Sequence, residues 1–67
     1  MITDKQQRTF DLLKVMLDEK GYPPTVREMA VRLNVTPATI QQSLNHLVKA
    51  GLVSRSAGAA RSLQVIE

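Results

Sequence analysis

The chain has 67 residues, a formal net charge of +3 and no cysteine. This length suits one domain with a core near the lower limit for independent stability, and it leaves no room for an additional catalytic domain. Disulfides and thiol chemistry are excluded. With no apolar leader and no apolar run of about 18 residues, the sequence predicts a single cytoplasmic domain over residues 1–67.

Positive charge is unevenly distributed along the sequence. Residues 1–28 carry five basic and five acidic side chains, which cancel. Residues 29–66 carry four basic side chains and no acidic one. Because a polyanion meets no repulsion along that second part, the distribution favours nucleic acid as a partner.

A first helix is predicted over residues 4–20. Thr3 and Gln6 have the spacing of a capping box at its start, and Gly21 is typical of a left-handed helix stop. Its predicted buried face consists of Phe10, Leu13, Met16 and Leu17. Thr3 and Lys5 lie at the N-terminus of this helix, where a phosphate can be held.

The next segment, GYPPT at residues 21–25, predicts a stiff connector that leads into a second helix. Tyr22 is expected to act as a lid over the core. Thr25 and Glu28 repeat the capping-box spacing, so the second helix should begin immediately after Thr25. Its predicted apolar side consists of Met29, Ala30 and Leu33.

Residues 33–37, LNVTP, predict a tight turn between two helices. Asn34 tolerates the left-handed conformation, and Thr36 can cap a helix whose first position is Pro37. The predicted buried face of this third helix consists of Ile40, Leu44, Leu47 and Val48. The helix should end near Gly51. Two short helices joined by such a turn describe a helix-turn-helix.

In a helix-turn-helix the second helix of the pair presents its outer face to the DNA major groove. The candidate base-reading residues are Thr36, Ala38, Thr39, Gln41, Gln42 and Asn45. Asn and Gln side chains can bond an adenine edge in two places at once, so these residue types suit base reading. The alternative is a polar, solvent-facing surface of the kind that any small helical domain has.

A β-hairpin is predicted after the third helix, from strands over residues 52–55 and 62–66. Val53, Leu63 and Val65 would pack it on the helices, because a hairpin alone is too weak to stand. The expected fold is therefore mainly α with a small β-hairpin, a three-helix winged helix-turn-helix. Arg55 and Arg61 bracket the small-residue loop, which begins at Ser56, and are candidates for contacts with the DNA backbone. The alternative is a plain surface hairpin with two solvated arginines.

The residues that catalysis or metal binding requires are scarce. His46 is the one histidine, and no cysteine or clustered carboxylate accompanies it as a metal ligand. The six acidic residues are dispersed, and the three glycines form no phosphate-binding loop. The sequence therefore predicts a protein that is not an enzyme, with no metal, no cofactor and no small-molecule ligand.

Several motifs resemble the DNA-binding domain of the LexA repressor family. They are TDKQQ with FDLL near the N-terminus, GYPPT followed by Glu28 and Ala30, and the loop SAGAAR at residues 56–61. Arg32-Leu33, Thr36-Pro37, Leu44, Leu47, Lys49 and Gly51 also keep the order of that family. The resemblance covers essentially the whole chain. It implies a winged helix-turn-helix that binds palindromic operators as a dimer and represses transcription.

Site residues follow from the same resemblance, position by position. It implies base contacts from Thr36, Ala38, Thr39, Gln41 and Gln42. It implies phosphate or minor-groove contacts from Thr3, Lys5, Lys49 and Arg61. The chain departs from the family in a turn that is one residue shorter, and in Ala38, Gln41 and Gln42, which replace an Asn and two acidic residues. We therefore expect a different operator, with more adenine in its half-site.

LexA-type repressors also carry a C-terminal Ser-Lys self-cleavage domain that dimerises, which these residues do not include. The chain is then either an excised domain or a small stand-alone regulator, and one winged helix contacts only one half-site. A second class of function stays open: an interaction adaptor that uses Leu52, Val53 or an exposed Met29 as contacts. The acid-free second part of the chain favours DNA.

Overall fold

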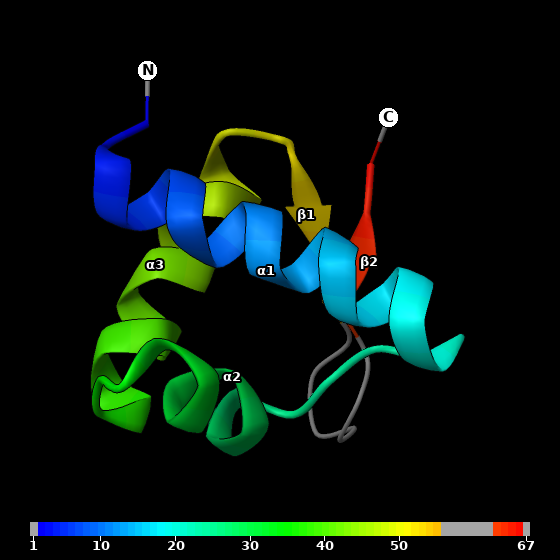
Figure 1. The fold of residues 1–67 in the computed structure, drawn as a ribbon. Helices are drawn as coiled ribbons and strands as arrows, with labels where there is room; N and C mark the ends of the chain where they lie inside the picture. Colours follow the sequence, from blue (N-terminus) through cyan, green and yellow to red (C-terminus); the bar gives the residue numbers. More distant parts are fainter. Residues whose placement is uncertain (1, 56–62, 67) are drawn as a thin grey trace.

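The computed structural model describes residues 2–55 and 63–66. Its elements are α1 (Asp4–Lys20), α2 (Val26–Leu33), α3 (Pro37–Lys49), β1 (Val53–Ser54) and β2 (Gln64–Val65). The third helix packs against α1, α2 and β1, and α1 lies in front of it in Figure 1. Three helices with a small antiparallel hairpin confirm the predicted winged helix-turn-helix.

Capping boxes begin the first two helices, as predicted. The Thr3 hydroxyl accepts a hydrogen bond from the Gln6 backbone N–H at 3.2 Å, and the Gln6 side chain accepts one from Thr3 N at 3.0 Å. Thr25 and Glu28 form the same pair of bonds, at 3.2 Å and 2.8 Å. Each box satisfies backbone donors that the first turn of a helix leaves without a partner.

Replacing Thr25 with alanine should lower the free energy of unfolding by about 1 kcal/mol, because the backbone N–H of Glu28 loses its acceptor. In a domain of this size that corresponds to a melting temperature about 4–8 °C lower. Thermal denaturation followed by circular dichroism measures the change. Thr25→Ser is the control, since it retains the hydroxyl. Equal melting temperatures for the two variants would show that the cap contributes nothing.

Left-handed residues end the helices where the sequence predicted them. Gly21 has φ 78° and donates its N–H to the Leu17 carbonyl at 2.8 Å. Asn34 has φ 57° at the end of α2, and the chain turns there into α3. Gly51, with φ 79°, follows α3. The turn between α2 and α3 is therefore as tight as a helix-turn-helix requires.

The core is built from all three helices and the hairpin. Its buried apolar side chains are Phe10, Leu13, Met16, Met29, Ala30, Ile40, Leu44, Leu47, Val53 and Leu63. Leu17, Leu33 and Val65 are partly buried and pack against this cluster. The predicted apolar faces of α1 and α2 and the predicted packing of the hairpin are thereby confirmed.

Two predicted core residues lie at the surface instead. Tyr22 is 45% exposed, whereas Pro24, two residues later, is fully buried and occupies the core side of the connector. Val48 is 38% exposed. At about 100° per residue it falls at the boundary between the buried and the polar sides of α3, which explains its partial exposure.

The apolar contacts proposed for an interaction adaptor are also corrected. Met29 is 0% exposed and Val53 is 1% exposed, so neither is available to a partner. Leu52 is partly buried and packs against the core cluster. The reason is that Met29 lies on the inner face of α2 and Val53 on the inner face of the hairpin, where the core covers them.

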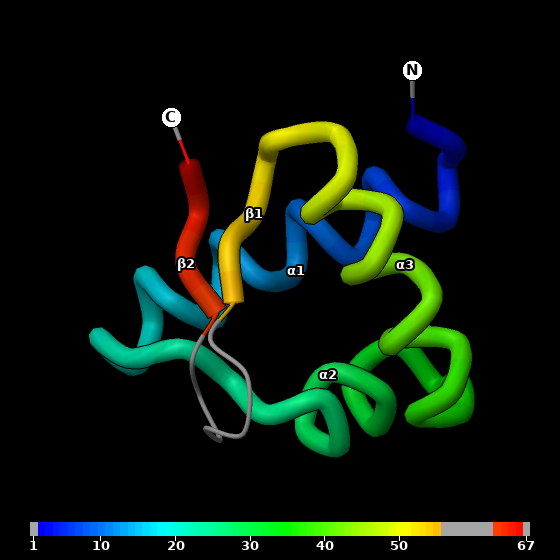
Figure 2. The backbone as a smooth tube through the Cα atoms, turned by 180° about the vertical axis from the view of Figure 1, so that it is seen from behind, coloured from blue at the N-terminus to red at the C-terminus, as the bar shows by residue number. Residues whose placement is uncertain are grey.

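The hairpin is shorter than predicted. Val53 pairs with Val65 and Ser54 with Gln64, and the Ile66 N–H donates to the Leu52 carbonyl at 2.9 Å. Figure 2 shows the two strands side by side at one edge of the fold. The wing residues Ser56 and Arg61 lie outside the described residues.

Candidate nucleic-acid interface

A continuous polar face runs the length of α3. It consists of Ala38, Gln41, Gln42, Asn45 and Lys49, all of them exposed. At about 100° per residue, these positions fall within an arc of about 100°. The buried residues of the helix, Ile40, Ser43, Leu44 and Leu47, occupy the opposite side. Packing on the core thus turns the predicted base-reading side chains outward.

Thr36 and Thr39 lie at the leading end of this polar face. The Thr36 hydroxyl accepts a hydrogen bond from the Thr39 N–H at 3.3 Å, and the two hydroxyl oxygens are 3.0 Å apart. Thr36 therefore acts as the predicted N-cap, with Pro37 in the first turn. Because one hydroxyl donates to the other, one hydroxyl hydrogen of the pair is left for a DNA acceptor.

The structure brings Lys5 and Arg8 of α1 next to the start of α3. Together with Thr39 they line a cavity of about 110 Å³, whose other lining residues are Thr9, Leu33, Val35 and Ile40. Lys5 was predicted to contact phosphate, but Arg8 was missed. Its position three residues after Lys5, on the same side of a helix, was the signal that could have identified it.

Thr3 lies where the sequence predicted it, at the N-terminal cap of α1. It is exposed at the start of α1, but its hydroxyl already accepts the Gln6 N–H as the helix cap. Asp4 adds a negative charge in the first turn, which opposes anion binding at a helix N-terminus. The basic side chains that the structure places in this region are Lys5 and Arg8.

Arg55 joins the hairpin to the polar face of α3. It follows β1 directly, and its Nη1 donates a hydrogen bond to Oε1 of Gln41 at 3.0 Å. The strand β1 packs against α3, which makes this contact possible. Sequence analysis placed the two residues in separate parts of the interface, whereas the structure makes them partners.

Cations flank the polar face without acidic partners. Among residues 2–55 and 63–66, Lys5, Arg8 and Lys49 form no ion pair, whereas Arg32 lies 3.4 Å from Glu19. Lys5 and Arg8, which belong to α1, lie beside the start of α3, and Lys49 lies in the last turn of α3. Positive charge is thus available at both ends of the polar face.

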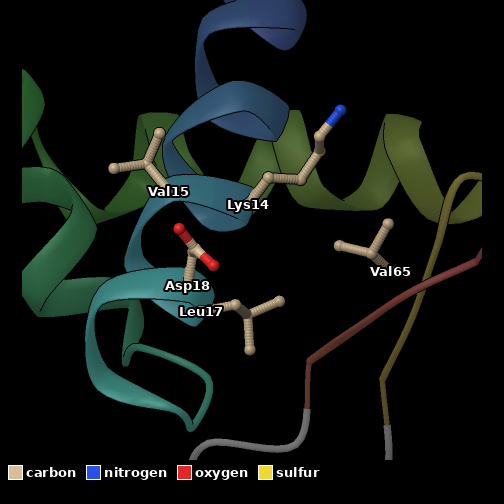
Figure 3. Close-up of a pocket in the computed structure, with 5 residues that line it drawn as sticks. All are labelled: Lys14, Val15, Leu17, Asp18 and Val65. Atoms are coloured by element: carbon tan, nitrogen blue, oxygen red, sulfur yellow. The ribbon is translucent and has the colours of Figure 1, made fainter.

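A hollow of about 570 Å³ between α1 and β2 offers no comparable site. It is lined by Lys14, Val15, Leu17, Asp18 and Val65, and the Lys14 amine points away from the Asp18 carboxylate (Figure 3).

His46 is bonded to its own helix, with Nδ1 3.0 Å from the Gln42 carbonyl oxygen. Within the described ranges, no three His, Cys, Asp or Glu side chains gather as metal ligands. No described helix is both long and apolar enough to cross a membrane.

Comparison with known proteins gives one family. The model of the LexA DNA binding domain matches residues 1–62. The LexA repressor of Oleidesulfovibrio alaskensis is 41% identical over 64 residues, which are 96% of this chain and 31% of that protein. The LexA repressor of Clostridium botulinum is 36% identical over 66 residues, 96% of this chain and 32% of that protein. The LexA repressor of Magnetococcus marinus is 32% identical over 66 residues, which are 98% of this chain and 29% of that protein.

The chain spans about a third of the length of the curated relatives it matches. Within that part, the family model covers nearly every residue of the chain. The three helices, the tight turn before α3 and the hairpin after it give the fold that the resemblance implied. This chain belongs to the LexA DNA-binding domain family.

Proposed function

We propose that the chain is the sequence-specific, double-stranded DNA-binding part of a transcriptional repressor that acts in the cytoplasm. The proposal requires no cofactor, no small-molecule ligand and no catalytic step. The observation that carries it is the polar face of α3, which is exposed, free of acidic residues and flanked by cations at both ends. The repressor names of the relatives support the same role.

In this proposal α3 enters the major groove and reads base edges with its polar face. Gln41, Gln42 and Asn45 supply hydrogen-bonding groups, and the methyl group of Ala38 suits contact with a thymine methyl. Thr36 and Thr39 meet the DNA at the leading end of the helix. The polar side chains at the centre of this face specify the DNA sequence. The cations around them contact phosphates and fix the position of the helix on the duplex.

Phosphate contacts come from three elements in this arrangement. Lys5 and Arg8 of α1 lie beside the start of α3, and Lys49 lies in its last turn. The hairpin contributes Arg55, and the proposed wing also includes Ser56 and Arg61. Contacts of this kind release counterions, so binding should weaken as salt rises.

We further propose that two copies bind an inverted repeat, one on each half-site. Selection of bound duplexes from a randomised library at near-physiological salt tests both statements. An enriched motif supports sequence reading, and an inverted repeat in that motif supports paired binding. Binding without any enriched motif, lost as salt rises, would mean that only nonspecific phosphate attraction remains.

Gln42→Ala should relax specificity while leaving nonspecific binding intact. We expect the preference for adenine at one half-site position to fall about tenfold, because a two-point amide contact with that base is lost. Affinities for the selected duplex and for its single-base variants measure this. The control is Gln7→Ala, which removes the same exposed side chain from α1. Equal losses on every duplex would contradict a base-reading role for Gln42.

A further inference from the structure

The hydrogen bond between Arg55 and Gln41 lies on the surface proposed to meet DNA. Arg55 Nη1 and Gln41 Oε1 are 3.0 Å apart, and fourteen residues separate the two side chains in the sequence. Both residues are exposed. The bond involves Gln41, a side chain that the proposed function assigns to base reading. The inference about base selectivity therefore rests on that proposed function.

This bond determines how the Gln41 amide is oriented. A guanidinium group carries five N–H donors and no acceptor, so only the amide oxygen of Gln41 can face Arg55. The donor is charged, which makes the bond stronger than one between neutral groups. The bond occupies one of the two lone pairs of the amide oxygen, so an adenine amino group would have to share this oxygen with the charged guanidinium, whereas the amide nitrogen keeps both hydrogens for DNA. Gln41 and Arg55 together present donors.

Two-point reading of adenine needs the amide oxygen and the amide nitrogen together. The oxygen must accept from adenine N6, and the nitrogen must donate to adenine N7. Guanine instead presents two acceptors, N7 and O6, in the major groove. A pair whose free groups are mainly donors matches the guanine edge, whereas an adenine amino group that approaches the shared oxygen would meet the guanidinium N–H groups donor to donor.

We propose that Arg55 is a positioning residue that makes Gln41 select guanine over adenine. The neighbouring Gln42 supplies the contrast. It is also exposed, and its side-chain amide forms no hydrogen bond within residues 2–55 and 63–66. Gln42 therefore keeps both amide groups for adenine. Two consecutive glutamines of α3 read different bases, because the hairpin holds only the first.

The orientation of Gln41 is testable without DNA. In the free protein, Arg55→Ala should move the side-chain amide resonances of Gln41 in an NMR spectrum more than those of Gln42. Arg55 is exposed at the end of β1, so the variant should keep the wild-type melting temperature. Equal displacement of the two glutamines, or none, would overturn the pairing.

The selectivity is measured on DNA. The base pair that Gln41 contacts is identified as the position where Gln41→Ala abolishes discrimination. At that position the wild-type protein should bind the guanine duplex about tenfold more tightly than the adenine duplex. Arg55→Ala should remove or reverse this ratio, because the amide oxygen of Gln41 is released. Arg55→Lys should retain part of it, since lysine also donates but lacks the planar fork.

The outcomes separate this inference from the proposed function. If the wild-type protein selects a motif but Arg55→Ala weakens guanine and adenine duplexes equally, Arg55 only contacts phosphate and the positioning role is wrong. A preference for adenine at the Gln41 position in the wild-type protein would also overturn it. If the wild-type protein selects no motif, the proposed function fails and the base selectivity fails with it.

Discussion

Leu44→Ala is expected to unfold most of the domain at physiological temperature. Leu44 is 0% exposed, in the middle of the helix that contacts α1, α2 and β1. Leucine-to-alanine changes in a core cost about 2–5 kcal/mol, from lost burial and from the cavity left behind. Domains of this size rarely have more than about 3–5 kcal/mol of stability. One truncation therefore removes most of the free energy of unfolding.

Urea denaturation followed by circular dichroism measures the loss. Val48→Ala is the matched control, because Val48 lies one turn further along α3 and is 38% exposed. We expect that variant to lose less than about 1 kcal/mol. Similar losses for both variants would contradict the assignment of Leu44 to the centre of the core. DNA binding by Leu44→Ala should fall in parallel with its folded fraction.

Neutralising Lys5 and Arg8 together should weaken binding to every DNA sequence by a similar factor. The two side chains lie beside the start of α3 and have no acidic partner among the described residues. Each phosphate contact releases about 0.9 counterion, so Lys5→Gln with Arg8→Gln should reduce the salt dependence, the slope of log K against log salt, by about 1.8. The corresponding loss of affinity at 0.15 M salt is about 30-fold.

Affinity titrations at several salt concentrations, on the selected duplex and on an unrelated one, test this prediction. The control is Lys14→Gln with Lys20→Gln, which removes the same charge from the same helix. Lys14 lines the hollow between α1 and β2, and Lys20 lies in the last turn of α1, so both are away from the start of α3. If the control variant shows the same change in slope, net charge matters and the position of Lys5 and Arg8 does not.

Local patterns in the sequence were sufficient to predict the three helices and their ends. Thr3 and Thr25 start helices because their capping partners lie three residues away along the chain. Gly21 and Asn34 end helices because these residue types adopt the left-handed conformation at little cost, whatever their neighbours are. The polar face of α3 also follows from helical spacing alone. Each of these features depends on neighbours within one or two turns, so one sequence was enough.

Tertiary structure decided which residues of different elements meet. The cluster of Lys5, Arg8 and Thr39 depends on how α1 crosses α3, and the bond from Arg55 to Gln41 depends on where β1 packs. The exposure of Tyr22 and the burial of Pro24 likewise depend on the path of the connector over the core. No spacing along the chain encodes these contacts, because side-chain packing between distant segments sets the crossing of the helices and the position of the hairpin.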